Sequence, residues 1–133
     1  MQQGDDVDLS QVGAASFGDL QIDVIDPIKD YVDYLATIFD FDLIKSFLSS
    51  GQFKVRFDAL HGVTGPYARA LLVERFGLPD DAVQNWVPKP DFGGGHPDPN
   101  LTYAKSLVDA MKSEGLNFGA ASDGDGDRNM ILG

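Results

Sequence analysis

The stretch FGAASDGDGDRNMIL, residues 118–132, decides the fold. It places two short apolar runs, 118–121 and 129–132, on either side of a segment rich in Asp and Gly. Short apolar runs bounded by turn residues are typical of buried strands. The stretch therefore predicts two strands joined by an acidic loop at 122–128.

The N-terminal part of the chain is expected to become ordered gradually. Residues 1–21 mix Gly, Asp, Ser, Gln and Ala with little periodicity, which predicts a flexible or weakly extended lead-in. A short alternating strand is expected at 22–25. Asp26 and Pro27 then predict a helix start, because Asp caps free amides and Pro fits the first helical position. We divide the chain into this lead-in and one α/β domain, 22–133.

The remaining apolar patterns alternate between helical and strand spacing. The expected elements are a helix over about 43–48, a strand over 53–57, a helix from the 61–66 turn to Gly77, a strand over 82–87, an irregular segment over 88–99, and a helix with the stripe Leu101, Ala104, Leu107, Val108 and Met111. Asn100 is expected to cap that last helix. This order predicts a three-layer α/β/α domain with a mainly parallel sheet.

Composition excludes several classes of protein. The 133 residues suit about one domain, and 43% hydrophobic with 23% charged residues is ordinary for a globular chain. A net charge of −11 argues against a nucleic-acid binder. No apolar run approaches the ~20 residues of a membrane helix, and a chain without Cys has no disulfide, zinc-thiolate site or thiol nucleophile. We expect a cytoplasmic protein with no nucleic-acid or membrane partner.

The acidic loop carries carboxylates at three alternate positions, Asp123, Asp125 and Asp127. The intervening glycines let the backbone coil tightly, so the three side chains are expected to converge. Two carboxylates ~4 Å apart repel by ~4 kcal/mol at an effective dielectric of ~20, and a hard divalent cation reverses that sign. Oxygen-only ligands favour Mg²⁺ or Ca²⁺ over zinc. Arg128, which follows directly, is suited to hold a phosphoryl group.

Two plainer interpretations compete with a metal site. A solvated Asp-Gly turn uses the same residue types, but three acids directly after a buried strand favour metal binding. An EF-hand is rejected because its sixth loop position needs Gly, where Arg128 stands, and because a strand precedes the loop. His61 and His96 lie in Gly- and Pro-rich loops, so structural roles are expected for both. Residues 92–100 are expected to shape the domain edge beside the acidic loop.

Four stretches together resemble the α-D-phosphohexomutases, and the phosphoglucomutase branch in particular. Residues 123–130 look like the magnesium loop of that family. The other three stretches are DALHGVTGPY at 58–67, DFGGGHPDPNLTYA at 91–104 and FGAA at 118–121. Their order and spacing also fit over residues 22–133, which resemble the second of the four domains of that family.

The resemblance implies reversible conversion of glucose 1-phosphate to glucose 6-phosphate through a phosphoserine and glucose 1,6-bisphosphate. It implies that Asp123, Asp125 and Asp127 bind Mg²⁺, and that Asp127 and Arg128 lie near the bisphosphate substrate. The serine loop of the family, of the type TASHNP, does not occur in these 133 residues, so the phosphoserine would lie in a missing domain. We therefore expect a fragment that is inactive alone.

The partners implied by the resemblance are the three glucose phosphates and the missing domains of the same enzyme. Two alternatives stay open at this point. One is a non-catalytic binding or regulatory module that kept the fold. The other is a phosphomannomutase-type member, because the sugar-recognition loop, of the type GEESFG, is also absent from this sequence.

Overall fold

The sheet is built around strand β3 (Val55–Asp58) in this computed structural model, which describes residues 7–133. β3 pairs in parallel with β4 (Val83–Gln84) on one side and with β5 (Phe118–Ser122) on the other. β6 (Asn129–Leu132) pairs with β5 in the antiparallel sense, so the strand order is β4-β3-β5-β6. The predicted α/β class with a mainly parallel sheet is confirmed.

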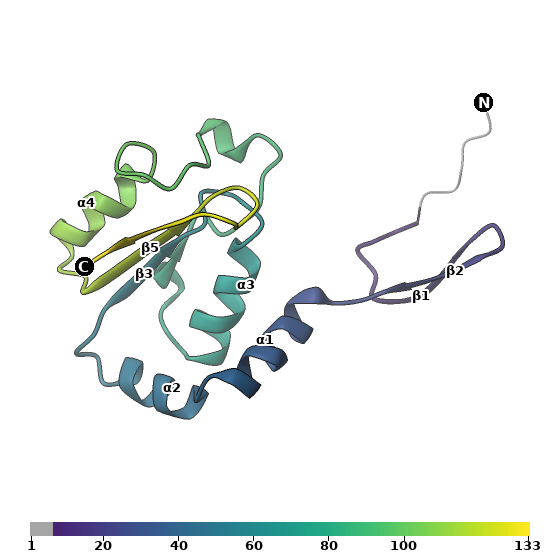
Figure 1. Ribbon diagram of the computed structural model, residues 1–133, viewed down its shortest axis with the longest axis horizontal. Coiled ribbons are helices and arrows are strands. Elements are labelled where there is room, and N and C mark those ends of the chain that lie inside the picture. Colours follow the sequence, from purple (N-terminus) through teal and green to yellow (C-terminus); the bar gives the residue numbers. More distant parts are fainter. Residues whose placement is uncertain (1–6) are drawn as a thin grey trace.

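Helix α4 (Lys105–Ser113) covers one face of this sheet (Figure 1). Its Leu107 is 0% exposed and packs in a cluster with Leu60, Ala104 and Ala121. Side chains of β6 add to the same cluster. Burying apolar surface contributes roughly 25 cal/mol per Å², so this cluster holds α4 on β5 and β6.

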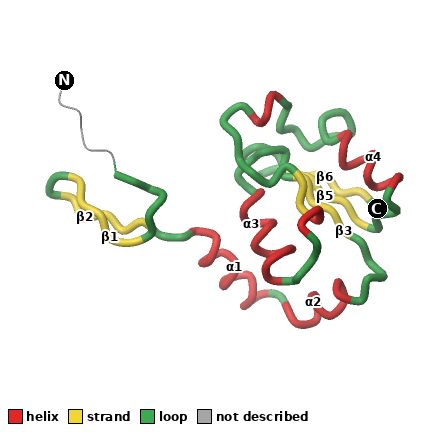
Figure 2. Tube along the Cα trace, turned by 180° about the vertical axis from the view of Figure 1, so that it is seen from behind, coloured by secondary structure: helices red, strands yellow, loops and turns green. Residues whose placement is uncertain are grey.

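The opposite face carries α3 (Gly65–Arg69), which continues directly into a π-helical segment, Ala70–Arg75. α1 (Pro27–Ile38) packs against both, and α2 (Phe41–Ser49) follows it, as Figure 2 shows from behind. The core of this layer is a second cluster of Phe41, Leu48 and Phe76, surrounded by Val32, Leu35, Ile44, Phe53, Val55, Leu71, Leu72 and Leu78. Helices on both faces give the predicted three layers. Within residues 7–133, no helix is long and apolar enough to span a membrane.

The start of α1 follows the predicted capping chemistry. The Asp26 carboxylate accepts hydrogen bonds from the backbone amides of Ile28 and Lys29, at 3.0 and 3.4 Å. Pro27 occupies the first helical position, where its missing N–H costs nothing. Asp and Pro together therefore fix where this helix begins.

Residues 13–24 form a β-hairpin, whereas the sequence analysis expected a lead-in as far as residue 21. β1 (Gly13–Phe17) pairs antiparallel with β2 (Leu20–Val24), and the chain reverses at Gly18 and Asp19. The prediction failed here because most side chains of the hairpin are exposed, so no apolar alternation marks a buried face. The hairpin stands away from the α/β body (Figure 2). Residues 1–6 of the predicted lead-in lie outside the described residues, and the domain division at residue 22 stays a prediction.

α4 begins later than predicted, because Asn100 caps a separate turn. Its side-chain oxygen accepts hydrogen bonds from the amides of Thr102 and Tyr103, each at 2.9 Å. The helix itself starts at Lys105. Leu101 is 64% exposed and is therefore not part of the buried stripe.

The strand predicted over 82–87 is also shorter than expected. β4 ends at Gln84 because Asn85 adopts a φ of 52°, in the left-handed region where a strand cannot continue. The Pro-rich segment 88–99 contains one short 3₁₀ turn, Phe92–Gly94, and is otherwise irregular, as predicted.

Leu107→Ala is expected to lower the free energy of unfolding by about 2–5 kcal/mol, because it leaves a cavity in the cluster beneath α4. Leu101→Ala makes the same chemical change at an exposed position and is expected to stay within about 0.5 kcal/mol. Urea denaturation followed by circular dichroism measures both variants. Equal losses would contradict the placement of α4 given above.

Candidate metal centre

The loop between β5 and β6 brings three carboxylates together. Asp123 follows directly after β5, and one carboxylate oxygen from each of Asp123, Asp125 and Asp127 lies within 4.8 Å of the other two. Asp123 is buried, whereas Asp125 and Asp127 are exposed to solvent. The three side chains thus converge as the coiling of the chain predicted.

Gly126 is the residue that allows this coil. Its φ is +86°, a conformation that residues with a side chain rarely adopt. A Cβ atom at this position would also lie 2.7 Å from the Cγ2 atom of Thr64, the residue that precedes α3. Both the backbone conformation and the neighbouring side chain therefore require glycine here.

Asp123 is the anchored member of the cluster. Its Oδ1 atom accepts hydrogen bonds from the backbone amides of Gly126 at 2.9 Å and Arg128 at 3.1 Å, and its Oδ2 atom accepts one from Nε of Arg128 at 2.9 Å. Burial alone would raise the pKa of this carboxyl. The hydrogen bonds from the amide and side chain of Arg128, together with those of Asp127 and Asp125, outweigh burial and hold the pKa of Asp123 below its ordinary value, so Asp123 is a carboxylate at neutral pH.

Asp127 shows the electrostatic cost of the arrangement. Its interaction with the Asp123 carboxylate, followed by the negative charges of Asp125 and Asp123, raises its pKa above the ordinary value. Arg128 acts in the opposite direction, but less strongly. A cluster of this kind favours any cation that shares its oxygen atoms.

Arg128 lies against the cluster and reaches a fourth acid. Besides Asp123, its guanidinium contacts the carboxylates of Asp98 at 3.3 Å and Asp127 at 3.6 Å. The side chain is 64% exposed, and a guanidinium has more N–H donors than these contacts use. Sequence reasoning placed residues 92–100 beside the loop but did not single out Asp98. The sequence signal that could have identified Asp98 is an acidic residue within a Pro-rich segment.

The two histidines are engaged in contacts outside the carboxylate cluster. Nδ1 of His61 lies 2.8 Å from the carbonyl oxygen of Val87. His96 stacks on Tyr103 with ring centroids 4.6 Å apart. These contacts agree with the structural roles predicted for both side chains.

A cavity of about 660 Å³ opens beside the loop. Most of its lining surface is apolar, from side chains such as Phe57, Leu71 and Leu72, and polar groups come from Thr64, Tyr67, Ser122, Asp125, Arg128 and Asn129. Arg128 is the one cation among these lining residues, and it is therefore the group of this region suited to a phosphate.

Residues 29–133 match the family model described as phosphoglucomutase/phosphomannomutase, alpha/beta/alpha domain II. The chain belongs to this family. The resemblance inferred from the sequence is confirmed, and the fold is that of phosphoglucomutase domain II.

Individual phosphoglucomutases are similar to nearly the whole chain. Chloroplastic phosphoglucomutase 1 of Marchantia polymorpha is 57% identical over 129 residues, and the phosphoglucomutase of Schizosaccharomyces pombe is 59% identical over 128. Each match covers 96% of this chain, but only 20% and 23% of those proteins. The chain thus spans less than a quarter of the length of these two relatives.

A solved structure agrees with the sequence matches. The open form of pp63/parafusin from Paramecium, an exocytosis-sensitive phosphoprotein and phosphoglucomutase, superimposes with a TM-score of 0.86 at 41% sequence identity. The match covers 96% of this chain and 25% of that one. Nearly the whole chain therefore shares the fold of the corresponding part of that phosphoglucomutase, and residues 29–133 of it are the domain II match.

Gly126→Ala is expected to destabilise the chain for two reasons, a left-handed backbone and a clash with Thr64. The backbone term costs about 1–3 kcal/mol, and the clash adds to it. Gly77→Ala is the matched control, because Gly77 has a similar φ of +78° but nothing within 4 Å of its added Cβ. Urea denaturation should show the larger loss for Gly126→Ala, and the reverse order would contradict the close approach to Thr64.

Proposed function

We propose that this chain is the metal-binding domain of a phosphoglucomutase that interconverts glucose 1-phosphate and glucose 6-phosphate. The observation that carries the proposal is the convergence of Asp123, Asp125 and Asp127 within a phosphoglucomutase domain II fold. A solvated turn would not need to hold three mutually repelling carboxylates this close together.

The donor set fits Mg²⁺. All three donors are carboxylate oxygens, the ligands that hard divalent cations prefer. Mg²⁺ favours six ligands and commonly binds a substrate phosphate as well as protein groups. Three aspartates therefore leave coordination positions of the ion free for other ligands. When bound, the ion would neutralise negative charge on a phosphoryl group during its transfer.

Arg128 and Asp127 are the proposed contacts to the sugar bisphosphate. Arg128 is exposed, and its guanidinium is held beside the carboxylates by Asp123 and Asp98. A planar guanidinium with free N–H donors binds phosphate oxygens through charge-assisted hydrogen bonds. Phosphoryl transfer depends mainly on positioning and charge neutralisation, and these residues can supply both.

The phosphoserine of the proposed reaction would come from another part of a longer enzyme. No TASHNP-type loop occurs in the sequence, so we propose that these 133 residues alone do not catalyse the conversion. The partners are then the glucose phosphates and the other domains of the enzyme.

The cytoplasm is the proposed compartment. The Marchantia polymorpha relative is chloroplastic, and cell fractionation distinguishes the two locations.

The 133-residue chain is expected to bind Mg²⁺ weakly, with a dissociation constant above the micromolar range, because three aspartates fill only about half of an octahedral shell. Isothermal titration calorimetry with MgCl₂ measures this affinity. The Asp125→Asn variant serves as the control, since it removes one charged ligand. Sub-micromolar binding by the unmodified chain would contradict the three-ligand site.

In the complete enzyme, Asp125→Asn is expected to lower turnover by at least the roughly 10–100-fold that loss of an outer-shell partner costs, while leaving the fold intact, because here the cation loses a negative ligand itself. The assay is formation of glucose 6-phosphate from glucose 1-phosphate, with mannose 1-phosphate as the competing substrate. Asp109→Asn, an exposed acid on α4 paired with Lys105, is the control and should leave turnover unchanged. Full activity of Asp125→Asn would exclude Asp125 as a ligand.

A complete wild-type enzyme that converts only the mannose substrate would overturn the proposed sugar specificity.

A further inference from the structure

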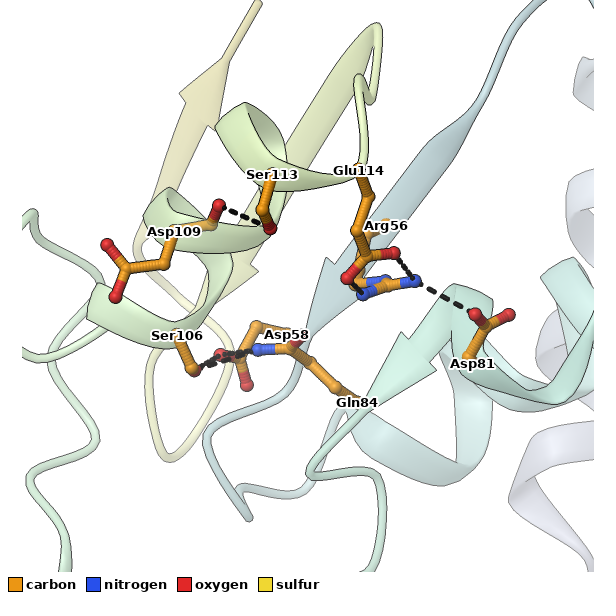
Figure 3. Close-up of polar contacts among 8 residues, drawn as sticks. All are labelled: Arg56, Asp58, Asp81, Gln84, Ser106, Asp109, Ser113 and Glu114. Carbon is orange, nitrogen blue, oxygen red and sulfur yellow. Dashed lines mark hydrogen bonds and ion pairs between the residues drawn. The ribbon is translucent and has the colours of Figure 1, made fainter.

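Asp58 is a fully buried carboxylate that the proposed reaction does not use. It is 0% exposed and lies at the C-terminal end of β3 (Figure 3). Its Oδ1 accepts hydrogen bonds from the amide of Leu60 and from Nδ2 of Asn85, each at 2.9 Å. Its Oδ2 accepts from Nε2 of Gln84 at 2.6 Å and from Oγ of Ser106 at 3.5 Å.

The four donors around Asp58 are all neutral. A buried charge is costly unless it is paired or fully hydrogen-bonded, and these donors supply the hydrogen bonds. They come from the turn after β3, from β4 and the residue after it, and from α4. The carboxylate therefore joins three parts of the fold at one end of the sheet.

Asp58 forms hydrogen bonds with residues in two stretches of backbone that have a left-handed conformation. Leu60 and His61 have φ values of 49° and 58°, and Asn85 has a φ of 52°. A residue such as Leu60 adopts this left-handed region only where its surroundings hold it there, whereas Asn adopts it more readily. Asp58 bonds directly to Leu60 and Asn85, and the amide of His61 donates to the carbonyl of Asn85 at 3.0 Å.

The strained turn after β3 lies directly against the acidic loop. A Cβ atom at Gly62 would lie 2.8 Å from the carbonyl oxygens of both Asp123 and Gly124. The amide of Val63 donates a hydrogen bond to the carbonyl of Gly124 at 3.0 Å. Any relaxation of residues 60–61 therefore moves the surface on which the first half of the loop rests.

We infer that Asp58 is a positioning residue for the metal loop. It holds the left-handed turn at 60–61, which in turn sets Gly62 and Val63 against residues 123 and 124. The inference rests on the proposed function, because it takes the loop to be a cation site. It adds a residue that touches neither the cation nor the substrate, yet sets the affinity for the cation.

The test measures Mn²⁺ binding to the 133-residue chain. The electron paramagnetic resonance signal of free Mn²⁺ reports how much of the ion remains unbound. Asp58→Asn keeps the size of the side chain but faces an amide group toward donors that need an acceptor. We expect its Mn²⁺ affinity to fall about tenfold, the lower end of what changes outside the ligand shell cost. Circular dichroism confirms that the measured sample is folded.

Arg56→Gln is the matched control, because Arg56 lies two residues earlier on the same strand. Its guanidinium bonds to Glu114 at 2.7 Å and to Asp81 at 3.0 Å, away from the loop (Figure 3). The variant loses the ion pairs of a largely buried guanidinium with two exposed carboxylates, so it is destabilised, but its folded form should bind Mn²⁺ like the wild type. A general loss of stability is thereby separated from a specific loss of affinity.

The outcomes distinguish this inference from the proposed function. If the wild-type chain does not bind Mn²⁺, the metal site itself is wrong, and the inference fails with it. If the wild type binds and Asp58→Asn binds equally well, only the inference is overturned. Should Asp58→Asn not fold, Asn85→Gly carries the test, because it removes one donor while still permitting a positive φ. That variant should bind less tightly than the wild type, and unchanged affinity would overturn the inference.

Discussion

Three carboxylates stay close together only where some other interaction offsets their repulsion, and the loop between β5 and β6 is organised around this constraint. Asp123 is fixed by three N–H donors from Gly126 and Arg128, all within the loop itself. Two backbone amides and the Arg128 guanidinium thereby stabilise one negative charge, while Asp125 and Asp127 remain in water. The site is thus rigid on its buried side and adaptable on the side from which a cation and a phosphate would approach.

The parallel pairing of β3 with β5 explains why two distant segments meet at this loop. The carboxyl ends of parallel strands lie at the same edge of a sheet, where α/β proteins commonly bind ligands. Asp58 and Ala121 are partners in the register, so the turn after β3 emerges beside the loop after β5. The turn and the loop can then contact each other through Gly62 and Val63.

Features set by neighbouring residues could be predicted from the sequence, whereas those set by distant contacts could not. The start of α1 depends on Asp26 and Pro27, and the tight coil of the acidic loop is made possible by its own glycines. The left-handed turn at 60–61 depends on Asp58, whose hydrogen-bond donors come from as far along the chain as Ser106. The late start of α4 was also missed, because Asn100 can cap either a helix or an isolated turn, and the sequence does not distinguish them.

The hairpin of β1 and β2 packs mainly against itself, and this affects how the chain unfolds. A two-stranded ribbon is only marginally stable in water, so its amide protons are expected to exchange with solvent through local opening. Amides of β5, at the centre of the sheet, are expected to exchange only through much larger openings. A single melting temperature therefore characterises the α/β body and not the polypeptide as a whole.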